Sequence, residues 1–160
     1  MNIFYLDGCP TTCARFTADK HVCKMIIEYA QLLSTAHYVL DGKQVGYKPT
    51  HKNHPCAVWV RHSARNYRHL YLMFLALCNE YTKRYNKVHK TSMLLDTLLN
   101  PPYNLALGHF TTPPQCMPDD CKGPDIVQAY RKLYLTHKKH FVTYKTTVPE
   151  WFQKGLDTNV

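Results

Sequence analysis

The sequence predicts an all-α fold of about four to five helices, built as one compact domain over residues 1–160. Apolar and aromatic residues recur at a helical period in residues 19–37, 55–85 and 124–141. Six prolines fall within residues 100–124, which favours a long extended loop over regular structure. Nearly half of the residues are hydrophobic, which is enough for a real core in a chain of 160.

The first predicted helix follows a short N-terminal segment. Residues 1–8 suit an extended lead, and Gly8, Pro10 and the two threonines after it suit a turn. The helix then runs to about His37 from Thr17 or Asp19, either of which would cap its free N–H groups. Its predicted buried stripe comprises Val22, Ile26, Tyr29, Leu33 and Ala36.

A basic loop, residues 41–55, leads to the second predicted helix. Pro55 suits its first turn, and the helix continues, with or without a kink, to about Tyr85. The residues with the clearest helical period in it are Tyr67, Leu70, Tyr71, Phe74, Cys78, Tyr81 and Tyr85.

Two shorter helices complete the predicted fold. One spans about residues 91–99 and stops before Pro101. After the Pro-rich loop, the last helix spans roughly residues 124–141 and presents Ile126, Tyr130, Leu133 and His137 on one face.

The charge balance favours a polyanionic partner. Lys and Arg number 20 against 11 Asp and Glu, for a net charge of +9. Such a surplus on a small domain is typical of nucleic-acid binding, although a protein can also be basic without such a partner. No apolar run approaches the length of a membrane span, and no secretory signal is recognisable. We therefore expect a cytoplasmic monomer with no membrane partner, its seven scattered cysteines reduced.

One stripe of the first helix carries chemistry-bearing side chains. His21, Lys24, Glu28 and Gln31 share one face at helical spacing, with Asp19 at its start. The stripe is either a solvated face, with a Lys24–Glu28 pair worth a few tenths of a kcal/mol, or an active site. In an active site, Glu28 would face a basic cleft with His54 or Arg61 on its other side.

Three segments, in order, resemble the phage pyrimidine-dimer DNA glycosylases of the endonuclease V type. "ADKHVCKMIIEY" resembles the first-helix motif of that family, and "VPEWF" resembles its Pro-x-Trp-aromatic segment. "HKNHPCAVW" resembles a His-Pro segment of smaller bacterial relatives. The matching residues are Ala18, Asp19, His21, Glu28, His54, Pro55, Trp59, Pro149, Trp151 and Phe152.

The resemblance implies an all-α enzyme that cleaves the glycosidic bond of a damaged or modified pyrimidine in double-stranded DNA and then nicks the backbone. The family's nucleophile is the α-amine, here that of Met1, and its glutamate corresponds to Glu28. His21 would position the sugar or phosphate. Such enzymes bend DNA and flip a base out of the stack.

The match departs from the family at several positions. Asn2 is too large for the usual removal of Met1, which shifts the amine by one residue. Ile27 and Gln31 stand where the family has arginines, and a further family arginine near the N-terminus is replaced by Asn2 or Ile3. A relative that acts on another modified base, and a non-catalytic nucleic-acid-binding protein on the same scaffold, therefore remain as alternatives.

Cysteines and histidines invite a metal interpretation, but their spacing argues against it. Cys9-x3-Cys13, His51-x2-His54-x-Cys56 and Cys116-x4-Cys121 lack the spacing of a zinc knuckle. We predict no metal and no cofactor, so that chelators leave DNA binding and nicking unchanged. A metal-containing nucleobase-modifying enzyme is the third and weakest hypothesis.

Basic patches interleaved with tyrosine supply the predicted nucleic-acid contacts, with ordinary solubilising charge as the alternative. One patch, "KPTHK", lies in the loop before Pro55, and the other, "KRYNKVHK", contains Lys83 and Arg84. The residues predicted to contact DNA are Lys20, Lys24, Gln31, Lys48, Lys52, His54, Arg61, Lys87 and Lys90.

Overall fold

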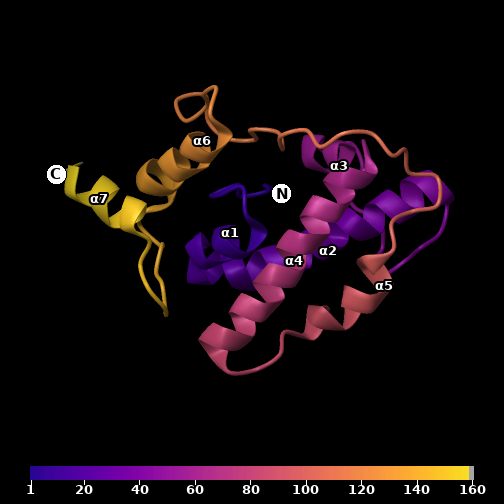
Figure 1. Ribbon diagram of the computed structural model, residues 1–160, viewed down its shortest axis with the longest axis horizontal. Helices are drawn as coiled ribbons and strands as arrows, with labels where there is room; N and C mark the ends of the chain where they lie inside the picture. The colour runs from indigo at the N-terminus through magenta and orange to yellow at the C-terminus, as the bar shows by residue number, and fades with distance from the viewer. Residues whose placement is uncertain (159–160) are drawn as a thin grey trace.

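A computed structural model describes residues 1–158 and confirms the all-α prediction for that range (Figure 1). Residues 1–158 form seven α-helices, two more than the upper expectation. They are α1 (Pro10–Phe16), α2 (Asp19–Asp41), α3 (Pro55–Val60), α4 (Ala64–Tyr85), α5 (Leu95–Leu99), α6 (Ile126–Leu133) and α7 (Glu150–Thr158). A 3-10 turn, Lys90–Leu94, precedes α5, and a wide helical turn, Tyr134–Lys138, extends α6.

Helices α2 and α4 form the centre of the fold and pack against each other. The predicted stripe of α2, from Val22 to Ala36, is buried as expected. Helix α2 ends at Asp41, four residues later than predicted, and Gly42 follows with a φ of 68° as a left-handed C-cap. On α4 the predicted stripe is also confirmed, except that Tyr81 and Tyr85 are only half-buried.

Two predictions about helix starts were wrong. Residues 10–16 form helix α1 rather than a turn, because Pro10 occupies the first helical position, where its missing N–H costs nothing. Neither Thr17 nor Asp19 caps α2. The N-cap is Ala18 without a side-chain bond, while the Thr17 hydroxyl donates to the Cys13 carbonyl oxygen.

The second predicted helix is interrupted. Arg61 ends α3, and Ser63 starts α4 by accepting a hydrogen bond from the Asn66 N–H at 3.1 Å. Ser63 also donates to the His109 carbonyl oxygen, which fixes the Pro-rich loop against this break. Where the sequence allowed for a kink, the structure therefore has two separate helices, α3 and α4.

The C-terminal region differs from the prediction mainly in its length and in its last helix. Asp125 caps α6, which ends at Leu133 instead of continuing to residue 141. Helix α7 was not predicted. Figure 1 shows the Pro-rich loop running along one edge of the molecule, so that α6 and α7 lie at the opposite end from α5.

The N-terminal segment is enclosed by helices rather than lying on the surface. Ile3, Phe4, Tyr5 and Leu6 are all buried, and the Phe4 N–H donates to the Tyr29 hydroxyl at 3.1 Å. In Figure 1 the N-terminus accordingly lies near the middle of the view, while α7 lies at its outer end. The first residues of the chain are therefore held next to α2 and α3.

None of the helices within residues 1–158 is both long and apolar enough to span a membrane.

Candidate active site

The N-terminal amine lies close to the start of α3. The Ile3 backbone N–H is directed at the Cys56 sulfur, which places the first residues beside this helix. The positive charge of the amine adds to the burial that lowers the pKa of the His54 imidazole, and it opposes the burial that raises the pKa of the Cys56 thiol to about 12. Met1 itself packs against the hydrophobic core and is only partly exposed.

Glu28 faces this region from α2. Its side chain is 18% exposed, and the nearest cation is Lys24, whose Nζ lies 3.9 Å from Oε1. The negative charge of Glu28 acts in the opposite sense to the amine and offsets a small part of the lowering of the His54 pKa. Amine, imidazole and carboxylate therefore form one electrostatic group, contributed by the N-terminal segment, the loop before α3, and α2.

His54 is held by its role as the N-cap of α3. Its Nδ1 accepts a hydrogen bond from the Cys56 N–H at 3.1 Å, so the neutral ring carries its proton on Nε2. Partial burial is the main reason that its pKa is lowered, followed by the amine and by His51. At neutral pH the ring is thus uncharged and presents Nε2–H as a donor.

His21 does not lie on the solvated ridge of α2. It is 6% exposed, and its ring stacks on Phe4 with 4.1 Å between centroids. The Tyr134 hydroxyl accepts from the Ala18 N–H and lies 2.8 Å from His21 Nδ1, to which it is placed to donate its proton. Burial lowers the pKa of His21 to about 3, with smaller effects from Lys138, Lys24 and Lys20, so the ring is neutral.

Asp19, at the start of the stripe, belongs to a buried ion-pair network. Its Oδ1 accepts from Arg84 Nη1 at 3.1 Å and from the Lys145 N–H at 3.0 Å. The second partner of the guanidinium is Glu80, whose Oε1 lies 2.9 Å from Nε. Arg84 was expected in an exposed basic patch, but its side chain is fully buried, so it is unavailable to DNA.

The other predicted nucleic-acid contacts differ in accessibility. Gln31 and Arg61 are half-buried, and Arg61 Nη1 is a buried donor without a hydrogen-bond partner among the described residues. The lysines are exposed and include Lys20, Lys24, Lys48, Lys52, Lys87 and Lys90. Lys20 Nζ stands over the Phe141 ring at 5.4 Å from its centroid, so part of this surface already pairs a cation with an aromatic ring.

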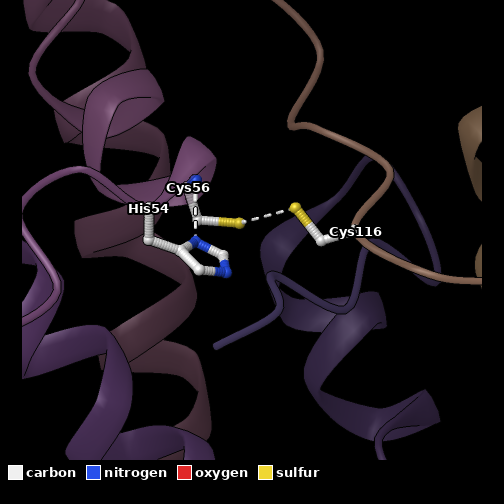
Figure 2. A group of neighbouring side chains, drawn as sticks. All are labelled: His54, Cys56 and Cys116. Carbon is white, nitrogen blue, oxygen red and sulfur yellow. Dashed lines mark hydrogen bonds between the residues drawn. The ribbon is translucent and has the colours of Figure 1, made fainter.

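Two cysteines, Cys56 and Cys116, lie in this region, although their spacing in the sequence predicted no role for them in a site (Figure 2). Cys116 of the Pro-rich loop reaches Cys56 with 3.9 Å between the sulfurs. One ligand atom each from His54, Cys56 and Cys116 lies within 4.8 Å of the others. Spacing along the chain put Cys116 in a different group from His54 and Cys56, because 60 residues separate the two cysteines.

Comparison with known families identifies one that this chain matches. The sequence profile described as pyrimidine dimer DNA glycosylase matches residues 1–93, which include α1 to α4 and the residues around the amine, Glu28 and His54. No curated protein and no solved structure matches the chain. The matched part covers more than half of the 160 residues, and the chain belongs to the pyrimidine dimer DNA glycosylase family.

Proposed function

We propose that this protein is a DNA glycosylase with associated AP-lyase activity, which removes a damaged or modified pyrimidine through an imine on its N-terminal amine. The observation that carries the proposal is the grouping of the amine, Glu28 and His54 within the part of the chain that matches the family. Family membership supports DNA as the substrate, and the net charge of +9 suits a polyanion.

The α-amine is a suitable nucleophile because its reference pKa is about 7.7–8.0, which leaves a neutral fraction near pH 7. In the proposed reaction the Met1 nitrogen forms a bond to C1′ as the bond from C1′ to the base breaks. The base leaves with a proton. Opening of the sugar ring then gives an imine between the amine and C1′.

Glu28 is proposed to act twice. A carboxylate beside the sugar stabilises positive charge that develops at C1′ while the base departs. After the imine has formed, the same carboxylate accepts the C2′ proton, and the electrons released expel the 3′ phosphate and nick the strand. Half-burial with only a distant lysine partner supports this role, because the charge of Glu28 is not neutralised by a close ion pair.

The two histidines are assigned different roles. His54 presents Nε2–H near the amine and the carboxylate and is proposed to donate a hydrogen bond to the sugar or the phosphate. His21 is proposed to act through Phe4: its stacked ring and its contact with Tyr134 fix the segment that carries the amine. This is a positioning role, since a neutral buried ring cannot provide charge to a phosphate.

Two side chains next to Glu28 on α2 bear on which lesion the protein removes. Ile27 and Gln31 replace two arginines expected for dimer recognition, and Ile27 is exposed beside Glu28 on α2. An apolar and an amide side chain would contact a flipped or displaced base without adding charge. We therefore propose a damaged or modified pyrimidine as the substrate class.

Borohydride trapping tests the proposal. The protein is incubated with duplex DNA that contains one abasic site, borohydride is added, and the adduct is digested and mapped by mass spectrometry. We expect a covalent adduct on the residue 1 amine, and none with protein whose α-amine has been acetylated beforehand.

Replacement of the two family arginines favours a second candidate, a non-catalytic nucleic-acid-binding protein. Tight binding to the abasic duplex without any adduct would support this candidate and reject the imine mechanism. An adduct that maps to an internal lysine would reject the assigned nucleophile.

A further inference from the structure

Three side chains at the start of α3 have the composition of a metal site. His54, Cys56 and Cys116 offer one imidazole nitrogen and two sulfurs, all within 4.8 Å of one another (Figure 2). Nitrogen and thiolate ligands in this ratio suit a borderline-soft cation such as Zn²⁺. Three protein ligands leave one tetrahedral position open.

The separation of the two sulfurs fits a bridging ion. Tetrahedral coordination with Zn–S bonds of about 2.3 Å holds two sulfurs about 3.8 Å apart, and Cys56 and Cys116 are at 3.9 Å. A disulfide needs about 2.05 Å, so oxidation would have to pull the Pro-rich loop toward α3. The observed spacing therefore needs almost no movement for a metal and a substantial one for a covalent bond.

A second cluster of similar composition is less suitable. Asp120, Cys121 and His137 also bring their ligand atoms within 4.8 Å. However, Asp120 and His137 are exposed, and His137 Nε2 is already bonded to both carboxylate oxygens of Asp120. In the first cluster, by contrast, Cys56 is fully buried, while His54 and Cys116 are half-buried, which leaves a route for an ion.

The fourth position has a neighbour that can fill it. The Ile3 N–H is directed at the Cys56 sulfur, which places the N-terminal amine, two residues earlier in the chain, beside the cluster. A neutral amine is a nitrogen ligand of the same class as imidazole. The N-terminal segment cannot easily swing away, because Ile3 to Leu6 are buried.

We propose that His54, Cys56 and Cys116 bind Zn²⁺ and that the N-terminal amine completes the coordination. Binding releases the protons of the two thiols to water. The lone pair of His54 Nδ1, which now accepts a hydrogen bond from the Cys56 N–H, is donated to the metal instead. The cap hydrogen bond from the Cys56 N–H is exchanged for the metal bond, which is the stronger interaction.

Occupancy of this site has a regulatory consequence, which rests on the proposed function. An amine bound to Zn²⁺ has no free lone pair and cannot attack C1′. The metal would therefore act as a reversible inhibitor and not as a cofactor. Chelators would then raise nicking by protein that carries zinc, which departs from the sequence-based prediction of no metal and of nicking unchanged by chelators.

Metal binding is tested directly by titrating reduced, metal-free protein with Co²⁺ and following the thiolate charge-transfer bands and the visible bands of a tetrahedral site. We expect one ion per chain, displaced by Zn²⁺.

Cys116→Ser and His54→Asn should each weaken binding more than about 100-fold, beyond the usual effect of changing an outer-shell partner. Asparagine preserves the helix cap. Cys9→Ser removes an exposed thiol outside the cluster and should bind normally. No stoichiometric binding, or equal affinity in all variants, would overturn the proposal.

The amine is tested separately, without DNA. Protein with and without one equivalent of Zn²⁺ is acylated briefly, and modification of the residue 1 amine is compared with that of Lys52 by mass spectrometry. We expect Zn²⁺ to slow acylation of the amine at least about tenfold while Lys52 reacts unchanged, and Cys116→Ser to abolish this protection. Equal acylation with the metal bound would overturn the place of the amine in the site. Neither readout depends on glycosylase activity, so the failure of this inference is distinguishable from the failure of the proposed function.

Discussion

A histidine on the polar ridge of a helix is ordinarily hydrated, whereas His21 is enclosed by rings from three separate segments. Phe4, Tyr134 and Phe141 surround the imidazole, and within residues 1–158 the Tyr134 hydroxyl is its only short polar contact. Such an environment favours the neutral ring, because a buried cation loses its hydration without gaining an opposite charge. His21, which the sequence suggests as an active-site group, is thus a fixed contact for the N-terminal segment.

Stability should therefore depend on pH through His21. Its pKa is about 3 in the folded protein and about 6.5 when unfolded. Between these values the unfolded chain binds the proton more readily, so stability is lost as pH falls below 6.5. From pH 7 to pH 5 this residue should remove about 2 kcal/mol from the free energy of unfolding. Urea denaturation of the wild type and of His21→Gln should show a smaller loss in the variant. Equal losses in the two proteins would contradict the assignment.

Glu28 should carry a large part of the rate. Glu28→Gln keeps the shape and hydrogen bonding of the side chain but removes its charge, and we expect nicking of abasic DNA to fall about 10²–10⁴-fold. Folding and DNA affinity should be nearly unchanged, because the one ion pair of Glu28 among the described residues is the 3.9 Å contact with Lys24. Lys24→Gln breaks the same contact and serves as the control, with nicking reduced far less. An unimpaired Glu28→Gln variant would contradict the role proposed for this carboxylate.

At the scale of elements, Arg84 joins α4 to the first two helices. Its Nη atoms donate to the Thr17, Ala14 and Arg15 carbonyl oxygens as well as to Asp19. With Nε bonded to Glu80, every donor of the guanidinium is used. The C-terminus of α1 and the N-terminus of α2 therefore depend on one side chain of α4.

Arg84→Ala should be strongly destabilising. It leaves the Asp19 and Glu80 carboxylates buried without their cation, for which a loss of about 3–5 kcal/mol is expected. The neighbouring Lys83→Ala is the matched control, since Lys83 is exposed and should change stability by less than about 0.5 kcal/mol. Chemical denaturation of both variants provides the measurement. Equal stability of the two would show that the network contributes little.

The two long helices could be predicted from the sequence, and two of the short helices could not, for physical reasons. Helices α2 and α4 are long and bury a continuous stripe, so their period identified them. Helices α1 and α7 have only 7 and 9 residues, and each is stabilised mainly by tertiary packing, which includes contacts of Phe16 with Trp151. The break after α3 depends on Ser63 and on its bond to the distant His109 carbonyl oxygen, which no local pattern reveals.

The candidate site was predictable only in part. Glu28 and His54 were identified by their resemblance to family motifs, and the structure brings their charges together with the amine. The burial of His21 could not be foreseen, because it depends on Tyr134, 113 residues away. Cys116 likewise approaches Cys56 through a loop without regular structure and outside the residues that match the family. Residues supplied by such long-range contacts leave no trace in local spacing.

For the whole molecule, the distribution of charge separates structural cations from available ones. Arg84 is fully buried, and Arg131 pairs with Asp7 at 3.6 Å and lies over the Trp151 ring. The exposed lysines before α3 and after α4, Lys48, Lys52, Lys87 and Lys90, have no ion-pair partner within the described residues. They are therefore free to neutralise phosphates.

DNA affinity should fall steeply as salt is raised. Each neutralised phosphate releases counterions, so a protein with 6–10 phosphate contacts loses roughly 10³–10⁵ in affinity between 50 and 200 mM salt. We expect fluorescence anisotropy with a duplex to show such a dependence. Changing Lys48 and Lys52 to Ala should lower the slope of log K against log salt by about 2, one per lost phosphate contact. Lys122→Ala is the control, because Lys122 is paired with Asp119 at 2.8 Å and should leave the slope unchanged. Affinity that stays constant over this range would exclude DNA binding through charge, and with it the role proposed for these lysines.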